Sequence, residues 1–143
     1  METFKSKHVG CYGVVYNNKN QVLLIKKSRG AYKGKLDLPD GGIDYGESAS
    51  DTLKREFDEE VGLKIKDFFL KTIVINYVVW NLDETHLEDL QHIAIIYDVK
   101  LGSEQEDKIK KVADGHDSLG AMLYDVDKLT KDELSPLVLC IME

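Results

Sequence analysis

Residues 41–63 constrain this chain more than any other stretch, because they combine a well-marked helix with acids that a stable helix does not need. Ser48 can cap the helix, with Asp51 three residues later as its capping-box partner, and Gly62 is a natural stop. We therefore expect a helix over residues 48–61. At about 100° per residue its apolar side chains form one stripe facing a core. These are Ala49, Leu53, Phe57 and Val61.

Three carboxylates share one flank of this helix, beside the apolar stripe. Glu56 and Glu60 fall within about 20° of Ala49, and Glu59 lies about 60° further out. Like charges at this spacing repel, and acids in a last turn oppose the helix dipole. Carboxylates near a core also lose hydration unless a partner replaces it. Because no local stability rule favours this arrangement, it indicates a functional site. A solvated, glutamate-rich surface helix is the alternative.

The spacing of particular residue types extends this pattern beyond the helix. Gly41 is followed after five residues by Glu47, and after seven more by the run REFDEEVGL, which starts at Arg55. This run and its spacing resemble the Nudix box, G-x5-E-x7-R-E-U-x-E-E-x-G-U with U apolar, at every fixed position. The resemblance is to MutT-like Nudix hydrolases. It implies an α/β fold, a Nudix-type α/β/α sandwich with a mixed β-sheet, which the irregular alternation of strands and helices also favours.

Composition limits the class of protein. The 143 residues are enough for one domain with one core, and we expect a single Nudix hydrolase domain over residues 1–143. No apolar run approaches the roughly 20 residues that span a bilayer, and no apolar segment follows the basic N-terminus as in a signal peptide. A net charge of -7 with a pI near 5.1 argues against binding duplex nucleic acid. Cys11 and Cys140 form no disulfide or zinc motif, which favours a reduced, cytoplasmic setting.

The remaining elements follow from apolar patterning and turn residues. We expect a hairpin from residues 9–16 and 21–27 and a second hairpin from residues 68–80 and 91–101. A short helix around residues 106–112, a strand over residues 119–126 and an apolar helix over residues 136–142 complete the chain. The apolar strand of the second hairpin and the C-terminal helix could form the contact surface of a homodimer.

Clustered carboxylate oxygens suit Mg²⁺ or Mn²⁺. Such an ion would neutralise the three glutamates, bridge phosphate oxygens and make its bound water a better nucleophile. By the resemblance, its ligands are Glu56, Glu59, Glu60 and the carbonyl of Gly41, and Glu60 is the first choice to orient the attacking water. Glu47 matches the first glutamate of the box, which binds a second ion or holds the loop in place.

The resemblance groups two further residues with the catalytic set. Arg55 points away from the metal flank on the helical wheel, and we therefore expect it to pair with a loop carboxylate. Some family members carry an additional glutamate before the last strand, where this chain has Asp114, His116 and Asp117. Of these we choose Asp117 as an auxiliary base or ligand. The variable box position, Asp58, faces solvent, and we expect it to be dispensable.

A basic loop over residues 28–35 leads directly into the box. It and the strand before it supply the candidates for phosphate contacts, which are Lys26, Lys27, Arg29 and Lys35. Tyr32 could stack on a base. Where family members often carry Trp and a Gly-Gly pair after the proline, this chain has Leu36 and Asp40, and Asp40 could add an acceptor near the metal.

The substrate is chosen by elimination. Subfamily signatures of ADP-ribose and diadenosine polyphosphate hydrolases are not met, since Val78 and Trp80 stand at those positions. The expected substrate is therefore a small nucleoside diphosphate derivative, with a nucleoside triphosphate, cleaved to monophosphate and pyrophosphate, as the leading choice. The alternative is a non-catalytic, nucleotide-binding or regulatory module with the Nudix fold.

Overall fold

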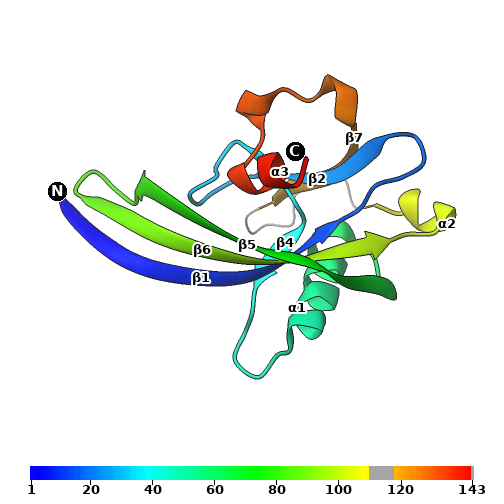
Figure 1. The fold of residues 1–143 in the computed structure, drawn as a ribbon, viewed down its shortest axis with the longest axis horizontal. Coiled ribbons are helices and arrows are strands. Elements are labelled where there is room, and N and C mark those ends of the chain that lie inside the picture. The colour runs from blue at the N-terminus through cyan, green and yellow to red at the C-terminus, as the bar shows by residue number, and fades with distance from the viewer. Residues whose placement is uncertain (110–117, 143) are drawn as a thin grey trace.

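Two β-sheets form the centre of the molecule in the computed structural model, which describes residues 1–109 and 118–142 (Figure 1). The larger sheet has the strand order β4-β1-β6-β5 and the smaller one the order β3-β2-β7. Because β6 runs parallel to β1 while β4 and β5 run antiparallel to their neighbours, the larger sheet is mixed. The strands are β1 (Glu2–Val14), β2 (Gln21–Lys27), β3 (Leu36–Asp37), β4 (Asp40–Gly42), β5 (Asp67–Asn81), β6 (His86–Lys100) and β7 (Ser118–Asp125).

Helices cover the two sides of this centre. Helix α1 (Ala49–Glu56) packs in one half of the core, where alternate strand residues such as Cys11 and Leu23 meet Leu53 and Phe57. Helix α3 (Pro136–Met142) packs in the other half, on the opposite strand faces. The expected α/β/α sandwich with a mixed sheet is confirmed. Shorter segments are α2 (Ser103–Glu106) and two 3₁₀ turns, Val126–Lys128 and Lys131–Glu133.

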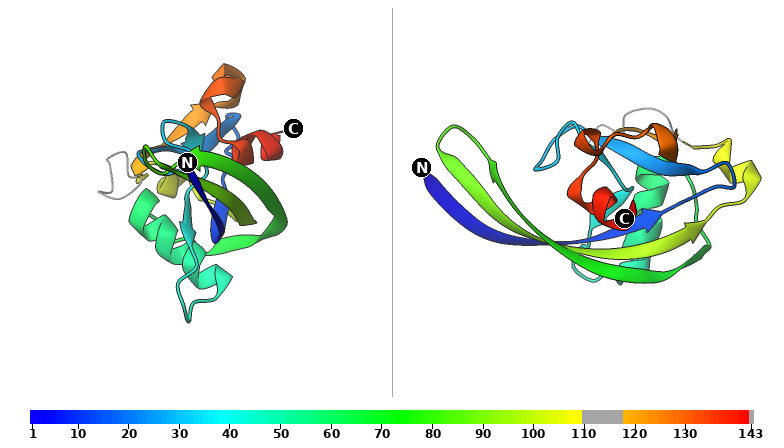
Figure 2. Two further views of the ribbon diagram at one scale, coloured as in Figure 1. Left: turned by 90° about the vertical axis from the view of Figure 1, so that its left-hand side faces the viewer. Right: turned by 45° about the horizontal axis from the view of Figure 1, so that its top comes forward.

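Strands β1, β5 and β6 continue beyond the helices as a curved three-stranded arm with the N-terminus at its tip (Figures 1 and 2). The second expected hairpin, β5 with β6, is confirmed and is longer than its apolar pattern indicated. The first expected hairpin is wrong in part, because β1 and β2 belong to different sheets and meet only at the Tyr16–Val22 bridge. Since β1 already pairs with β4 and β6, it has no free edge for β2.

The helix expected over residues 48–61 is present, with a change of geometry near its end. Ser48 Oγ accepts the Asp51 N–H at 3.1 Å, and the Asp51 carboxylate accepts the Ser48 N–H at 3.4 Å, which forms the capping box. Gly62 ends the helix with φ 78°, but residues Phe57–Val61 form a π turn. Such wide turns are frequent at functional sites.

The other predicted elements have mixed outcomes. The C-terminal helix has the expected bounds. The helix expected over residues 106–112 is wrong in its described part, because α2 ends at Glu106 and residues 107–109 are not helical; residues 110–112 lie outside the described residues. Cys11 and Cys140 are both free. In the part of the chain that the structure describes, no helix is both long and apolar enough to cross a membrane.

Candidate active site

Arg55 is the centre of a charged cluster between α1 and the loop that precedes it. Its Nε donates to Glu47 Oε2 at 2.8 Å and its Nη2 to Glu47 Oε1 at 2.9 Å, a two-pronged bond to one carboxylate. Its Nη1 donates to Glu56 Oε1 at 2.6 Å and lies 3.5 Å from Glu59 Oε2. The expected pairing with a loop carboxylate is confirmed. The expected direction away from the glutamate flank is wrong, because the long side chain reaches across and offsets the repulsion there.

Glu47 connects the loop to the helix. Besides Arg55, it accepts the Asp44 N–H at 3.0 Å and the Thr52 hydroxyl at 3.1 Å. The hydrogen bonds from Arg55 are the main reason that the pKa of Glu47 falls to about 2. Arg55 also donates to the Gly42 carbonyl at 3.1 Å. These bonds support the loop-holding role of Glu47, and its role as a ligand of a second ion stays a prediction.

Glu56 packs directly against the main chain of Gly41. A Cβ at Gly41 would lie 1.9 Å from Glu56 Cδ, and only glycine therefore lets this carboxylate reach the start of the box. Burial raises the pKa of Glu56 to about 7, opposed by Arg55 and reinforced by Glu59 and Asp40. The carboxylates of Glu59 and Asp40 therefore lie close enough to Glu56 to disfavour its ionised form.

The other box acids differ sharply in exposure. Glu60 is only 1% exposed because β4 lies against this flank, and its Oε1 accepts the Asp40 N–H at 2.7 Å. Glu59 is half exposed at the rim. Asp58 is exposed, as expected, and lies 3.7 Å from Lys64.

The residue types of this cluster fit a hard divalent cation. Oxygen donors from Glu56, Glu59 and Glu60 come from one flank, and Gly41 leaves its main chain open beside Glu56. Within residues 1–109 and 118–142, however, no three His, Cys, Asp or Glu side chains stand together as a ready metal-binding group. The positive charge at Glu56 and Glu59 comes from Arg55.

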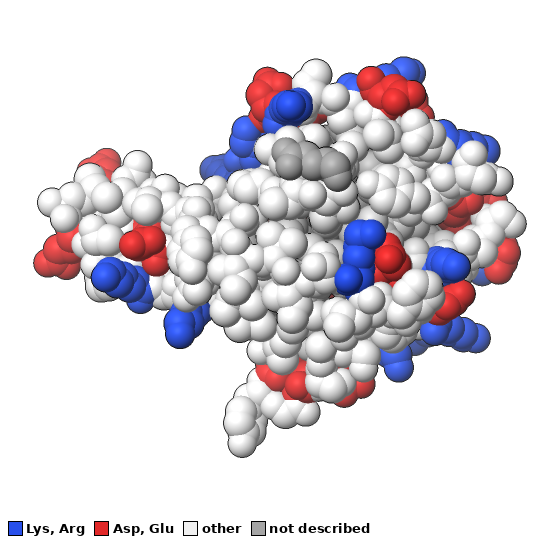
Figure 3. All heavy atoms as spheres, in the orientation of Figure 1, with Lys and Arg blue, Asp and Glu red and all other residues white. Residues whose placement is uncertain are grey.

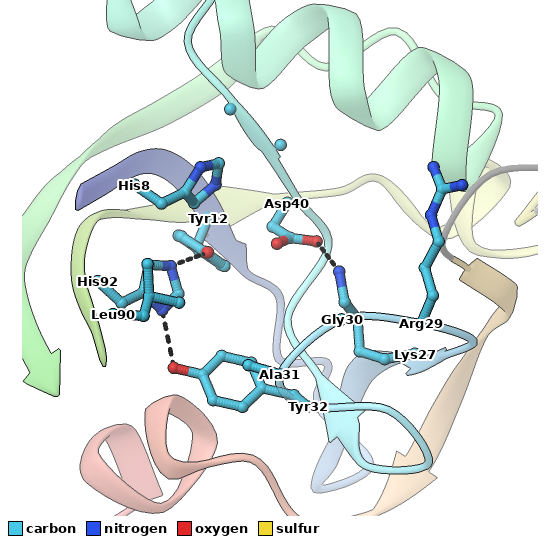
Figure 4. Close-up of a pocket in the computed structure, with 12 residues that line it drawn as sticks. His8, Tyr12, Lys27, Arg29, Gly30, Ala31, Tyr32, Asp40, Leu90 and His92 are labelled. Carbon is cyan, nitrogen blue, oxygen red and sulfur yellow. Dashed lines mark hydrogen bonds and ion pairs between the residues drawn. The ribbon is translucent and has the colours of Figure 1, made fainter. Parts of the chain in front are cut away.

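A pocket of about 330 Å³ opens beside the cluster, next to Gly41 and Gly42 (Figure 4). The sheet and the basic loop both contribute to it. Its principal side chains are His8, Tyr12, Lys27, Arg29, Tyr32, Asp40, Leu90 and His92. The pocket therefore combines aromatic walls with two cations and one carboxylate.

His92 joins the two tyrosines of the pocket. Its Nε2 is hydrogen-bonded to the Tyr12 hydroxyl and its Nδ1 to the Tyr32 hydroxyl, the latter at 2.9 Å (Figure 4). Burial, followed by the nearby His8 and Lys27, lowers the pKa of His92 to about 4. A neutral imidazole has one donor and one acceptor nitrogen, and one tyrosine therefore donates to the ring while the other accepts from it.

Both tyrosines keep their protons. Burial raises the pKa of Tyr12 well above its ordinary value and that of Tyr32 to about 12. The bond from Tyr32 to His92 ties the basic loop to strand β6.

Lys27 and Asp40 form an ion pair at 3.4 Å, with side chains 9% and 8% exposed. Because side chains alternate along β2, Lys27 points into the pocket while its neighbour Lys26 is exposed. Lys35 donates its Nζ proton to the main-chain oxygen of Asp132, outside the pocket lining.

The structure thus brings together only some of the predicted substrate contacts. Arg29 and Tyr32 line the pocket with Lys27, and Lys26 and Lys35 do not. Asp117, with Asp114 and His116, lies outside the described residues.

Tyr12 and His92 are pocket residues that patterning of the sequence missed. The alternation of side chains along the strand could have indicated His92, because it places His92 on the same buried face as Ala94 and Ile96. A histidine on that face is a buried polar group that needs partners. The sequence alone could not say that these partners lie on β1 and in the basic loop.

Comparison with known proteins identifies the family. The NUDIX domain profile matches residues 6–137, and the chain therefore belongs to the NUDIX family. An RNA pyrophosphohydrolase of Ruthia magnifica subsp. Calyptogena magnifica is 35% identical over 54% of this chain and 42% of its own length. An ADP-ribose pyrophosphatase of Methanocaldococcus jannaschii is 30% identical over 79% and 65%, and an 8-oxo-dGTP diphosphatase of Escherichia coli 32% identical over 41% and 46%. The matches thus span less than two thirds of each relative.

Solved structures support the same fold. A MutT NUDIX hydrolase from Burkholderia pseudomallei aligns with a TM-score of 0.72 at 20% identity, over 94% of this chain and 95% of that one. The NUDIX domain of Shewanella oneidensis NrtR, complexed with ADP ribose, aligns with a TM-score of 0.64 at 19% identity, over 95% and 85%.

Proposed function

We propose that this protein hydrolyses the diphosphate linkage of a nucleoside diphosphate derivative with a divalent metal ion. The observation that carries the proposal is the folding of the complete box into one cluster, in which Gly41 admits the Glu56 carboxylate and Arg55 connects Glu47 to Glu56. The pocket beside this cluster offers room and cations for a phosphorylated ligand. The names of the relatives, which are a pyrophosphohydrolase, a pyrophosphatase and a diphosphatase, support the same reaction type.

In this proposal Glu56, Glu59, Glu60 and the Gly41 carbonyl hold Mg²⁺ or Mn²⁺. The ion would supply charge neutralisation of the diphosphate and activation of water. Glu60 is suited to orient the attacking water, because its buried carboxylate is held by the Asp40 N–H. Arg55 keeps Glu47 and the loop in position. Asp117 remains the proposed auxiliary base.

The nucleoside part of the substrate belongs in the pocket. Tyr32 offers an aromatic surface for a base, and Lys27 and Arg29 offer positive charge for phosphate oxygens. We retain a nucleoside triphosphate, cleaved to monophosphate and pyrophosphate, as the leading substrate. The three relatives are named for three different substrates, and their names support diphosphate cleavage without choosing among them.

A binding or regulatory module is the second candidate. It is favoured by one observation, the similarity to a NUDIX domain complexed with ADP ribose. The complete set of box carboxylates favours the hydrolase, since a module that only binds its ligand has no need for the water-orienting Glu60.

The proposal also covers the cellular compartment and the binding partners. We infer that the protein works in a reduced, cytoplasmic environment, consistent with its two free cysteines. The net charge of -7 favours a small nucleotide over duplex nucleic acid or an anionic membrane surface as the partner. A homodimer is part of the proposal as well.

A hydrolysis screen with product identification tests the proposal. Purified protein with Mg²⁺ or Mn²⁺ is incubated with dNTPs, oxidised dNTPs, ADP-ribose, dinucleoside polyphosphates, nucleotide sugars and 5′-triphosphorylated RNA. We expect cleavage between phosphorus atoms of one of these classes. Tight binding of a nucleotide that stays intact after long incubation with metal would favour the module, and neither binding nor cleavage across the panel would refute both candidates.

A further inference from the structure

Strand β5 carries a row of exposed apolar side chains on one face. Ile73, Ile75, Tyr77 and Val79 alternate along the strand and are 56%, 49%, 71% and 58% exposed. Leu70, 58% exposed, joins them because the register with β6 shifts between Leu70 and Thr72. The shift keeps apolar side chains on the same face across the bulge. We call these five residues the β5 stripe.

The stripe and the pocket lie on opposite faces of the sheet. Ile75 pairs with Ile93, whereas Asn76 pairs with the pocket residue His92. On the stripe face, Ile95 and Tyr97 pack in the α1 half of the core, and the stripe continues beyond them along the arm. A broad uncharged surface is visible where the arm joins the body (Figure 3). A contact at the stripe would therefore leave the pocket open.

Strand β5 is also an edge strand in the described part of the chain, where β6 is its neighbour in the sheet. Proteins usually protect such edges with charged residues, proline or bulges. Residues 72–82 contain no charged residue and no proline, and the bulge lies at one end, near Lys71. The strand thus presents an open edge and an apolar face together.

We propose that the β5 stripe is the contact surface of a symmetric homodimer in which two β5 strands lie antiparallel. The charges that flank the strand favour a second copy in this orientation. Lys71 stands at one end, and Asp83 and Glu84 follow the other end. A twofold axis brings Lys71 of each copy near the acids of its partner, whereas a parallel arrangement would place like charges together.

The size of the stripe agrees with this occupant. At the observed exposures its five residues present roughly 600 Å² of surface, most of it apolar, which is near the upper end for a monomer's largest patch. That is a large part of the roughly 800 Å² that each partner buries in a standard interface, before the polar rim is added. With the twofold axis at the level of Asn76, whose side chain points to the opposite face, Ile73 would face the partner's Val79 and Ile75 the partner's Tyr77.

Helix α3, which the sequence also suggested as a dimer surface, is less suited to this role. Its Leu137 and Val138 are 0% and 1% exposed because they pack in the core of their own chain. The proposed contact is therefore the stripe alone.

Light scattering coupled to size-exclusion chromatography tests the proposal on the full chain. We expect the wild type at twice the chain mass of 16.2 kDa and Ile75→Lys at the chain mass. Leu119→Lys is the matched control, since Leu119 is a similarly exposed apolar residue, 53%, on strand β7. It should remain dimeric. Because the stripe faces away from the pocket, Ile75→Lys should keep turnover per chain within about twofold of wild type.

A monomeric wild type at its highest soluble concentration would overturn the proposal, and so would an Ile75→Lys variant that stays dimeric. A cross-linking experiment covers the case in which Ile75→Lys does not fold. In a Cys140→Ser background, Ile75→Cys should form a covalent dimer with a short bismaleimide linker, because residue 75 lies on the stripe face and its two copies stand only about two residues, roughly 7 Å, apart along the strands. Lys71→Cys should not, since five residues from the axis place its two copies roughly 30 Å apart. Equal cross-linking of both variants, or of neither, contradicts the arrangement.

Discussion

The charged cluster around Arg55 and the pocket around His92 are neighbours, but the chain assembles them in different ways. Arg55 is hydrogen-bonded to Glu47, eight positions earlier in the sequence, and to Glu56, the next residue. His92 bonds to Tyr12 and Tyr32 across 80 and 60 residues. The cluster is therefore encoded by local spacing on one helix and its loop, whereas the pocket depends on strand pairing and loop placement.

The two regions also handle burial of polar groups differently. In the cluster, one guanidinium supports several carboxylates, and charge is balanced by charge. In the pocket, burial keeps His92 neutral, and the ring satisfies both tyrosines with its two nitrogens. Substitutions in the cluster should consequently affect turnover and stability strongly, and those in the pocket should affect ligand affinity and pH response more mildly.

The largest effect is expected for Glu60→Gln in the cluster. Glutamine keeps the shape and can still accept the Asp40 N–H, but it removes the charge that would orient water. We expect kcat to fall by about 10²-fold or more while the melting temperature is retained. Steady-state kinetics on the substrate found in the screen and thermal unfolding check both expectations.

Asp58→Asn is the control for that change, because Asp58 is an exposed acid two residues away. Its kcat should match the wild type. Activity retained in Glu60→Gln, or lost equally in both variants, would contradict the role proposed for Glu60.

The next largest effect concerns the stability that Arg55 provides. Arg55→Gln leaves the Glu47 and Glu56 carboxylates without their shared cation, and we expect the free energy of unfolding to fall by about 2 kcal/mol. Urea denaturation measures this change. Lys66→Gln, at an exposed position, should change it by less than about 0.5 kcal/mol. Equal stability of the two variants would mean that Arg55 does not hold the cluster together.

The same contrast accounts for what could be predicted from the sequence. The capping box at Ser48, the stop at Gly62 and the pairing of Arg55 with Glu47 are local, and local rules predicted them. The reach of Arg55 to Glu56 was missed because a helical wheel fixes directions of Cα–Cβ bonds and not the ends of long side chains.

Non-local pairing explains the other misses. Nothing in the pattern of residues 9–27 reveals that β1 uses both of its edges on β4 and β6. The turn at residues 17–20 is present, but it is closed by the Tyr16–Val22 bridge and not by a full hairpin. Strand alternation predicts that the side chains of Lys26 and Lys27 point to opposite faces of β2. The sequence does not say which of these two faces borders the pocket, because that depends on how the sheets and the basic loop pack together.

Lys27 and Lys26 therefore form a matched pair for the pocket. Lys27→Gln removes a buried charge beside the proposed phosphates while keeping a donor for Asp40. We expect kcat/KM to fall about tenfold, mainly through KM, which corresponds to one charge-assisted hydrogen bond. Lys26→Gln, on the exposed face, should leave kcat/KM within about twofold. Equal losses would indicate a general electrostatic attraction and not a contact made in the pocket.

The smallest expected effect is a pH dependence of stability from His92. Its pKa is about 4 in the folded protein, against an ordinary value near 6.5. Between these values the unfolded chain binds a proton that the folded chain does not, and stability must fall as the pH falls through this window. Other groups titrate there too, and the difference between wild type and His92→Gln isolates the histidine. Urea denaturation at pH 7 and pH 5 should show that the wild type loses about 1–2 kcal/mol more than the variant. An equal loss in both proteins would mean that His92 takes up a proton without leaving its two tyrosines, and its ring would then be a further buried charge beside the Lys27–Asp40 pair of the same pocket.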